Sequence, residues 1–256
     1  GIELVVLDTK ADPQAAAVAY QDLVAKDVSA VIGPLLAKTT KAVSSRANSY
    51  GVPFVSLSKK DGIPDYGDST FRLGVTLESQ VEDLVTFASE NLGLRRFAMI
   101  YPNTASGEHF AKMFKQKVET SSAVLIAESI YPIGNPSAAE FAVSLVESYP
   151  IEAIFVPDTL ENSFSVLQYI ADSDYLKGVQ LLAPAYWDDP VSIRGYGQLT
   201  DKAIYVSPFF VKSKNPDVKE FVKAYEEAYE QQPGILAAQG YDAARLLEKA
   251  YISQLE

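Results

Sequence analysis

The feature that most constrains the fold of this chain is a regular alternation of short apolar runs with longer segments of helical periodicity. The pattern is clearest at residues 28–43, VSAVIGPLLAKTTKAV. Residues 28–32 form a β-branched apolar run typical of a buried strand, Gly33 and Pro34 end it, and helical periodicity begins near residue 38. Strands that alternate with helices of about 10–15 residues predict βαβ units and a parallel sheet.

The same alternation runs along nearly the whole chain. Strands are predicted at residues 2–7, 28–32, 51–56, 70–74, 96–101, 123–131, 153–156, 179–183 and 203–206. Helices are predicted at residues 13–25, 38–50, 77–92, 108–120, 137–149, 160–172, 216–231 and 236–253. Two such series follow one another, with the division near residue 75. We therefore expect an α/β fold whose parallel sheets are covered by helices on both faces.

The composition excludes several classes of function. Hydrophobic residues make up 48% of the 256 residues, which supports a sizeable core, yet no apolar run approaches the roughly 18 residues of a membrane span. A net charge of −11 disfavours nucleic acids and anionic membranes as partners. The chain has no cysteine and a single histidine, His109. Thiolate zinc sites, disulfides, cysteine nucleophiles and histidine triads are therefore excluded.

Sequence motifs of catalysis are missing as well. The chain contains no Gly-x-Ser-x-Gly elbow, no phosphate-binding P-loop and no Gly-x-Gly-x-x-Gly. Asp188 and Asp189 precede Pro190, a pattern typical of a capped turn and not of a metal site. We therefore expect a binding protein and not an enzyme, with no catalytic residues, no metal ligands and no cofactor.

The turn that follows residues 28–32 is a candidate binding element. A strand that enters a helix through a tight turn leaves backbone N–H groups at the carboxyl edge of the sheet. Open α/β sheets bind ligands at this edge, and a helix N-terminus attracts anions. Turns of this kind also occur in α/β proteins where they bind nothing. On the turn alone, both interpretations stay open.

Several phrases, taken together, resemble the type I periplasmic binding proteins of the leucine/isoleucine/valine-binding type. They are VVLDTKADP at 5–13, VSAVIGP at 28–34, YGVPFVS at 50–56, RFAMIY at 96–101 and GYDAA at 240–244. Their order and spacing match the family along nearly the whole chain. The resemblance implies two doubly wound parallel-sheet lobes with an interlobe cleft. The first lobe would comprise residues 1–75 and 209–256, and the second residues 76–208.

The resemblance also implies elements that this chain lacks. Members of the family usually begin with one more strand and helix before residue 2, and continue past residue 256. The chain thus resembles a version of the fold trimmed at both ends. The implied function is that of an exported solute-binding protein for an ABC-type importer, which captures a small ligand by hinge closure and has a membrane permease as its partner. The implied location is the periplasmic or extracellular face of a bacterial envelope, with a lipid anchor outside this chain as one option.

A second resemblance leaves an alternative function open. Leu57 and Ser58 followed by lysines, residues 179–190 and residues 234–243 resemble a branch related to penicillin-binding-protein activator lipoproteins. In that branch the two-lobed fold serves protein contact, with a cell-wall synthase as partner and no small ligand. The sensory domain of a receptor is a third alternative.

The resemblance to solute-binding proteins implies a set of ligand-binding residues. In the first lobe they are Leu36, Ala37, Lys38, Thr39, Ser58, Lys59 and Lys60, and in the second they are Tyr101, Thr104, Ser106, Asp158, Thr159, Tyr186 and Trp187. Ala37 stands where amino-acid binders of the family have a hydroxyl. Ala185 stands about where their acid meets the ligand's ammonium, and Asp158 is the remaining candidate anion.

These departures from the family pattern disfavour an α-amino acid and favour an anionic or aromatic ligand. Lys59 and Lys60 either bind an anion or are simply solvated. Tyr186 and Trp187 would offer stacking area to a planar ligand. The alternative for Trp187 is that it packs against the helices of its own lobe.

Overall fold

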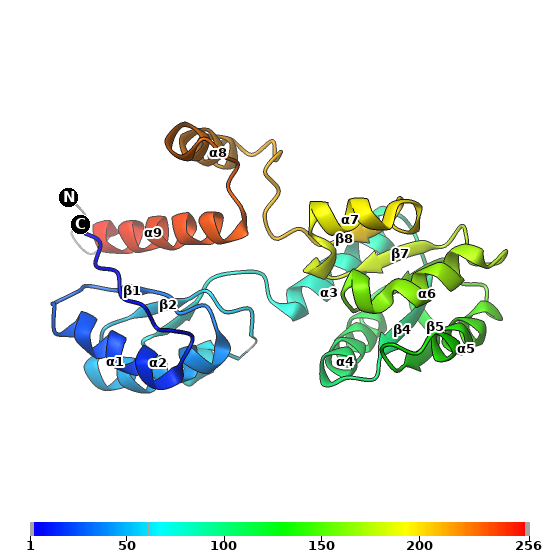
Figure 1. Ribbon diagram of the computed structural model, residues 1–256, viewed down its shortest axis with the longest axis horizontal. Coiled ribbons are helices and arrows are strands. Elements are labelled where there is room, and N and C mark those ends of the chain that lie inside the picture. Colours follow the sequence, from blue (N-terminus) through cyan, green and yellow to red (C-terminus); the bar gives the residue numbers. More distant parts are fainter. Residues whose placement is uncertain (1–2, 61, 254–256) are drawn as a thin grey trace. The chain divides into compact units, whose positions relative to one another are not determined.

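The structure is a computed structural model that describes residues 3–60 and 62–253. The chain divides into two compact units. Unit 1 consists of Gly1–Thr76 and Pro208–Glu256, and unit 2 of Leu77–Ser207. Each unit contains a parallel sheet with helices packed against it (Figure 1). The predicted α/β class with parallel sheets is confirmed.

Unit 2 is built on five parallel strands in the order β5-β4-β6-β7-β8. They are β4 (Arg96–Pro102), β5 (Val124–Tyr131), β6 (Ala153–Phe155), β7 (Gln180–Ala183) and β8 (Ile204–Tyr205). The chain adds β5 on one side of β4 and then β6 on the other side, so the direction of winding reverses between β4 and β6. In doubly wound sheets, ligands bind at the carboxyl edge beside such a reversal.

Helices cover both faces of this sheet. They are α3 (Leu77–Thr86), which continues into a π-helical turn (Phe87–Asn91), α4 (Ala105–Glu119), α5 (Pro136–Glu147), α6 (Leu160–Asp172) and the short α7 (Pro190–Tyr196). Successive residues of β4 point to opposite faces. Phe97 and Met99 belong to one buried cluster with α3 and α4, whereas Ala98 and Ile100 belong to another with α5 and α6. Burial on both faces explains why the strands are continuous apolar runs.

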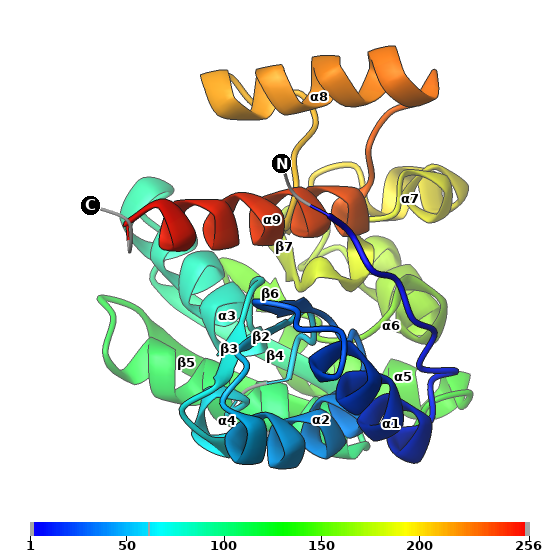
Figure 2. The same ribbon diagram turned by 90° about the vertical axis from the view of Figure 1, so that its left-hand side faces the viewer.

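Unit 1 has a smaller sheet of three parallel strands in the order β1-β2-β3. They are β1 (Val31–Ile32), β2 (Phe54–Ser56) and β3 (Thr70–Arg72), and the helices of the unit are α1 (Pro13–Val24), α2 (Ala37–Tyr50), α8 (Pro216–Tyr229) and α9 (Ile235–Ser253). The paired helices α1 and α2 lie on one side of the sheet, and α9 lies on the other (Figures 1 and 2). Tyr20, Val43 and Phe54 form part of the small core beneath the sheet.

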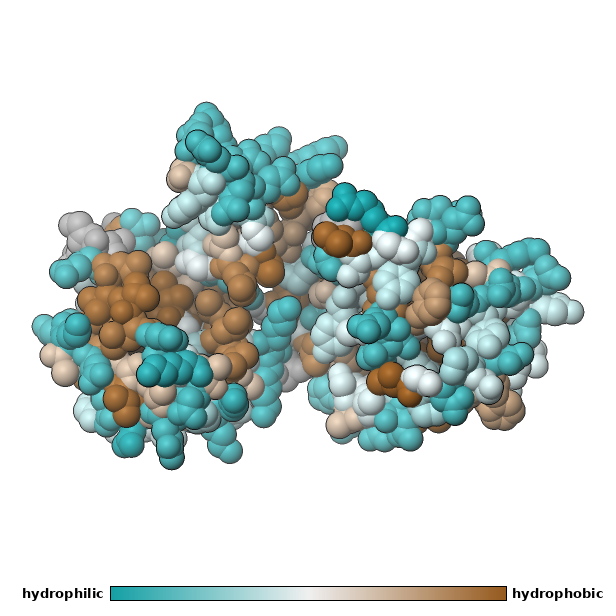
Figure 3. Space-filling model, in the orientation of Figure 1, coloured by the Kyte–Doolittle hydropathy of each residue, from teal (hydrophilic) through white to brown (hydrophobic). Residues whose placement is uncertain are grey.

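The strand predicted at residues 2–7 is wrong. Residue 2 lies outside the described residues, and residues 3–9 have irregular backbone. Leu7 and Thr9 of this segment line a groove together with residues 31–34. A strand needs a hydrogen-bonded neighbour about 4.8 Å away, and the apolar run here forms no such ladder. Leu4 and Val6 are left 78% and 77% exposed, and apolar surface is visible over this part of unit 1 in Figure 3.

Some element bounds also differ from the prediction. β1 and β2 are shorter than the predicted strands because Pro53, which lacks an N–H group, precedes β2 and limits its pairing with β1 to two residue pairs. Short 3₁₀ helices at Pro64–Tyr66, Ala185–Trp187 and Gly197–Leu199 were not predicted, nor was α7. Within residues 3–60 and 62–253, none of the helices has the length and apolarity to cross a membrane.

Candidate ligand-binding site

The N-terminus of α2 has no side-chain cap. Its N-cap residue, Leu36, has the extended backbone of a cap, but its side chain has no hydrogen-bond acceptor. By contrast, side chains cap α1, α4, α5, α6, α7 and α8, namely Asp12, Thr104, Asn135, Thr159, Asp189 and Asn215. Among the described residues, the N–H groups of Ala37, Lys38 and Thr39 therefore meet no acceptor. They lie just beyond the carboxyl end of β1 and can donate hydrogen bonds to an anion.

The predicted hydroxyls of unit 1 are turned inward. Thr39 is 1% exposed and its hydroxyl donates to the carbonyl of Leu36 over 2.8 Å. Ser58 is 3% exposed and its hydroxyl accepts from the N–H of Lys60 over 3.3 Å. Lys38, Lys59 and Lys60 are exposed. Unit 1 thus offers backbone donors and lysine cations, whereas its loops use these hydroxyls themselves.

Ser56 joins the two predicted loops of unit 1. Its hydroxyl lies 2.8 Å from that of Thr40, at the start of α2, and donates to the carbonyl of Pro34 over 3.2 Å. The same oxygen accepts from the N–H of Ser58 over 3.2 Å. The structure therefore brings residues 36–39 and 58–60 together. Sequence reasoning missed Ser56 and Thr40, although a buried serine at the end of an apolar strand was a usable signal.

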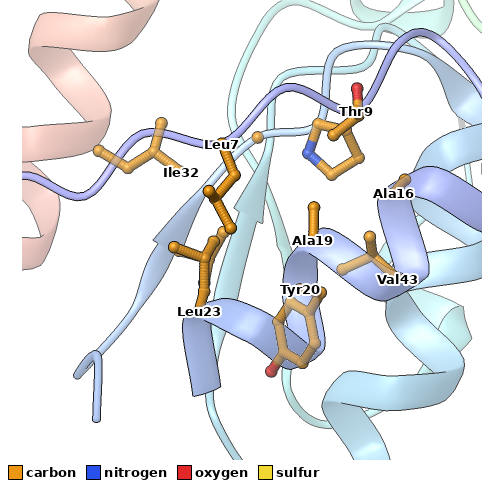
Figure 4. A pocket seen from close by; sticks show the side chains of 11 residues that line it. Leu7, Thr9, Ala16, Ala19, Tyr20, Leu23, Ile32 and Val43 are labelled. Atoms are coloured by element: carbon orange, nitrogen blue, oxygen red, sulfur yellow. The ribbon is translucent and has the colours of Figure 1, made fainter. Parts of the chain in front are cut away.

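The groove beside β1 ends next to this turn, at Gly33 and Pro34. Its floor is apolar and comes mainly from α1, as the side chains of Ala16, Ala19 and Tyr20 show (Figure 4). The groove has a volume of about 60 Å³. That volume accommodates a few water molecules, whereas pockets for small organic ligands take roughly 300 Å³ or more. The groove alone therefore does not serve as the ligand pocket.

In unit 2, two capped helices begin at the carboxyl edge beside the reversal between β4 and β6. Thr104 caps α4 by accepting from the N–H of Gly107 over 3.0 Å, and Thr159 caps α6 by accepting from the N–H of Asn162 over 3.3 Å. Ser106 is exposed in the first turn of α4. Tyr101 is half-buried against the cluster formed by α3 and α4. The predicted residues of unit 2 thus lie along one edge of its sheet.

Asp158 is buried at this edge and is already engaged within unit 2. It is 7% exposed. Its carboxylate accepts from the Tyr131 hydroxyl over 3.2 Å, from the Asn162 side-chain amide over 3.0 Å and from the N–H of Thr159 over 2.7 Å. Burial, and then the negative charge of Asp158, raise the pKa of Tyr131 well above its ordinary range. Tyr131 and Asn162 were missed by sequence reasoning.

The two predicted aromatic residues after β7 point in different directions. Trp187 is completely buried in the core on the α5 and α6 face, and its indole N–H donates to the main-chain carbonyl of Asp158 over 2.9 Å. Tyr186 is 42% exposed and meets Phe110 of α4 edge to face, with ring centroids 5.9 Å apart. Of these two residues, Tyr186 is the one whose ring is exposed. The ligand role of either residue stays a prediction.

Gln80 of α3 is a further residue that sequence reasoning missed. It is 2% exposed, and its side-chain oxygen accepts from the N–H of Ala185 over 2.9 Å. In the part of the chain that the structure describes, no group of three acidic, histidine or cysteine side chains is placed to hold a metal ion. The arrangement in both units suits binding, because it offers backbone donors, cations and one exposed aromatic ring.

Comparisons with known proteins support the same conclusion. The family model described as "Periplasmic binding protein" matches residues 1–251. No curated protein matches the chain. Among solved structures, an ABC transporter substrate-binding protein from Desulfitobacterium hafniense, in complex with Leu, is similar at 21% identity and a TM-score of 0.75, covering 97% of this chain and 72% of its own. A leucine-binding protein from Thermotoga maritima has 24% identity and a TM-score of 0.64, with 97% and 71% covered.

A third similar structure is a solute-binding protein of an ABC transporter from R. palustris, in complex with benzoate. It has 19% identity and a TM-score of 0.61, with 94% of this chain and 67% of its own chain covered. These likenesses show the fold, and the family model spans nearly the whole chain. With two parallel-sheet units in a single chain, the type I fold and this match over residues 1–251, the chain belongs to the periplasmic binding protein family.

Proposed function

We propose that this chain captures a small carboxylic acid outside the cytoplasm and delivers it to the permease of an ABC importer. The observation that carries the proposal is the uncapped N-terminus of α2. Its open N–H groups, which include that of Lys38, lie at the carboxyl edge of the unit 1 sheet. Hydrogen bonds of Ser56 link this turn to the loop that carries Lys59 and Lys60. Partial positive charge and aligned donors at a helix N-terminus favour a carboxylate.

The ligands of the solved relatives share this chemistry. The Desulfitobacterium hafniense structure contains Leu and the R. palustris structure benzoate, while a solute-binding protein from Rhodopseudomonas palustris BisB5 was solved with 3,4-dihydroxybenzoic acid. All three ligands carry a carboxyl group, and only leucine also carries an ammonium. In this chain Ala37 brings no hydroxyl to the helix N-terminus, and Asp158 is engaged within unit 2. Both facts favour an acid without an amino group.

Hinge closure is the mechanism that we infer. The acid binds first to the open N–H groups of α2, and the two units then close over it about the connections near residues 76–77 and 207–208. The ligand shifts the equilibrium toward the closed form by the difference between its binding free energy to both units and its binding free energy to one unit alone. The permease then recognises the closed form.

A thermal-shift screen of the folded chain tests this function. The screen contains benzoate, hydroxybenzoates, branched aliphatic acids, amino acids and small inorganic anions. At least one organic acid should raise the melting temperature by a few degrees, because a ligand that binds only the folded state stabilises it. A screen without any such increase would contradict the proposal, and would favour the alternative of a protein-interaction domain with no small ligand.

A further inference from the structure

The turn after β7 separates two aromatic side chains. Pro184 ends the strand, and the 3₁₀ helix Ala185–Trp187 follows it. One residue of this short helix, Trp187, is completely buried, and its neighbour Tyr186 is 42% exposed. The orientation of the turn therefore decides which ring faces outward at the carboxyl edge of the unit 2 sheet. A rotation of this turn would move both rings together.

Gln80 holds one end of the turn. It lies on the face of α3 that also carries the buried Val81, Leu84 and Val85, a position where an apolar residue would be expected. A buried amide costs free energy unless it is hydrogen-bonded, and the side-chain oxygen of Gln80 accepts the N–H of Ala185 over 2.9 Å. The bond joins residues that are 105 positions apart in the chain. Gln80 thus fixes the backbone of the turn to α3.

Asp158 holds the other end of the turn. Its main-chain carbonyl accepts the indole N–H of Trp187 over 2.9 Å. Its carboxylate is itself held by Tyr131 at the end of β5 and by Asn162 and Thr159 at the start of α6. Through Asp158, the Trp187 ring is thereby linked to the end of β5 and the start of α6. The carboxylate accepts hydrogen bonds from these donors, and it thereby positions Asp158 and the Trp187 ring bonded to its main-chain carbonyl.

Tyr186 is the residue that this arrangement presents. Its ring packs against the buried Phe110 of α4 at an interplanar angle of 85° and a centroid distance of 5.9 Å. The contact fixes the ring while leaving part of the side chain exposed. An aromatic ring held in this way offers a planar ligand a preorganised surface, so little entropy is lost on binding.

We propose that Gln80 and Asp158 are positioning residues, which lock the turn after β7 so that Tyr186 selects an aromatic acid over an aliphatic one. The specificity part of this inference rests on the proposed function. The locking of the turn is independent of it. The chain's single tryptophan, Trp187, reports that locking directly.

The experiment compares the full chain with Gln80→Met, which removes the acceptor and keeps the size of the side chain. Gln168→Met, at an exposed position of α6, is the matched control. Acrylamide quenching of Trp187 fluorescence should rise about twofold in Gln80→Met, because the turn is released, and should be unchanged in the control.

Gln80→Asn, whose shorter amide does not reach Ala185, repeats the measurement if the methionine variant does not fold. Asp158→Asn, which changes the carboxylate and keeps the main-chain carbonyl, should raise quenching less. Unchanged quenching in both Gln80 variants would overturn the locking role.

Calorimetric titrations with benzoate and with 4-methylpentanoate test the specificity role. Tyr186→Ala should weaken benzoate binding about tenfold and leave 4-methylpentanoate binding nearly unchanged, and Tyr186→Phe should retain the wild-type preference. Because Gln80 acts through Tyr186, the double variant Gln80→Met with Tyr186→Ala should bind benzoate no more weakly than Tyr186→Ala alone. Additive losses would overturn the positioning role. If the wild type binds neither acid nor any other carboxylate, the proposed function and the specificity role both fail, while the quenching comparison still decides the locking role.

Discussion

Gly107 shows how one residue shapes the carboxyl edge of unit 2. A Cβ at this position would lie 2.2 Å from the carbonyl oxygen of Pro102, which is backbone and cannot turn away. We expect Gly107→Ala to destabilise unit 2 by about 3 kcal/mol through overpacking. In Gly195→Ala, by contrast, the added methyl meets no atom within 4 Å, and stability should be equal or up to ~1 kcal/mol higher. Urea unfolding followed by Trp187 fluorescence measures both, and equal stabilities for the two variants would refute the close contact.

The buried Tyr131 predicts how stability depends on alkaline pH. Its folded pKa is raised by burial and by Asp158, so native Tyr131 keeps its proton at pH values where an unfolded tyrosine, with a pKa of about 10, loses it. Stability from this group is complete below about pH 10 and declines above it by up to ~1.4 kcal/mol per pH unit. Tyr20, whose pKa burial raises to about 12, contributes in the same direction in unit 1.

Tyr131→Phe removes the ionisable group and tests this pH dependence. Urea unfolding between pH 7 and pH 11, followed by Trp187 fluorescence, should show a shallower alkaline decline in Tyr131→Phe than in the wild type. Tyr175→Phe, at a residue that is 78% exposed, should behave like the wild type. Parallel declines in all three proteins would contradict the assignment of the raised pKa to Tyr131.

At the scale of single residues, the sequence predicted the loops but not the contacts. Asp158, Trp187, Ser58 and Thr39 follow strands whose ends are visible in the pattern, and their predicted role in ligand binding stays a prediction. Their partners were missed because a glutamine in an amphipathic helix, such as Gln80, has the same local pattern whether it is solvated or bonded to a turn 105 residues away. Long-range polar pairing leaves no mark on local periodicity.

Among the elements, α2 combines a structural weakness with the proposed binding role. Leu36 already has the backbone angles of an N-cap, φ −90° and ψ 140°. Leu36→Asp should therefore cap the helix and stabilise it by about 1 kcal/mol. The new carboxylate would also occupy the N–H groups that we assign to the ligand, and so carboxylate affinity should fall at least about tenfold. Calorimetric titration and far-UV circular dichroism measure the two effects. The control Leu36→Ala should change neither much, and undiminished affinity in Leu36→Asp would contradict the assigned site.

Elements with a long, regular pattern were predicted well, and elements that depend on a neighbour were not. Helices such as α4 and α6 were predicted within a few residues because their caps and apolar stripes are local. The strand expected at residues 2–7 has the apolar run of a buried strand, yet such a run alone does not supply a pairing partner. β1 was predicted too long for the same reason, since its extent is set by β2 and Pro53.

At the scale of the whole molecule, the two units differ in what holds them together. Unit 2 has two large buried clusters on the faces of a five-stranded sheet, whereas unit 1 has one small cluster under strands of two or three residues. Less buried apolar surface means lower stability, so unit 1 should unfold first. Far-UV circular dichroism reports both units and Trp187 fluorescence reports unit 2. We expect the circular dichroism transition to begin at a lower urea concentration than the fluorescence transition. Coincident transitions would show a single cooperative unit instead.

The central claim is that the chain is a solute-binding protein whose ligand is recognised by its carboxylate. Calorimetric titration of the full chain with benzoate, 4-methylpentanoate and leucine, each beside its carboxamide, tests this claim most directly. We predict saturable binding of at least one acid, with the matching amide weaker by about a hundredfold, because the amide lacks the charge that the α2 N-terminus and the lysines favour. Equal affinity for an acid and its amide, or no saturable binding by any of the acids, would contradict the account.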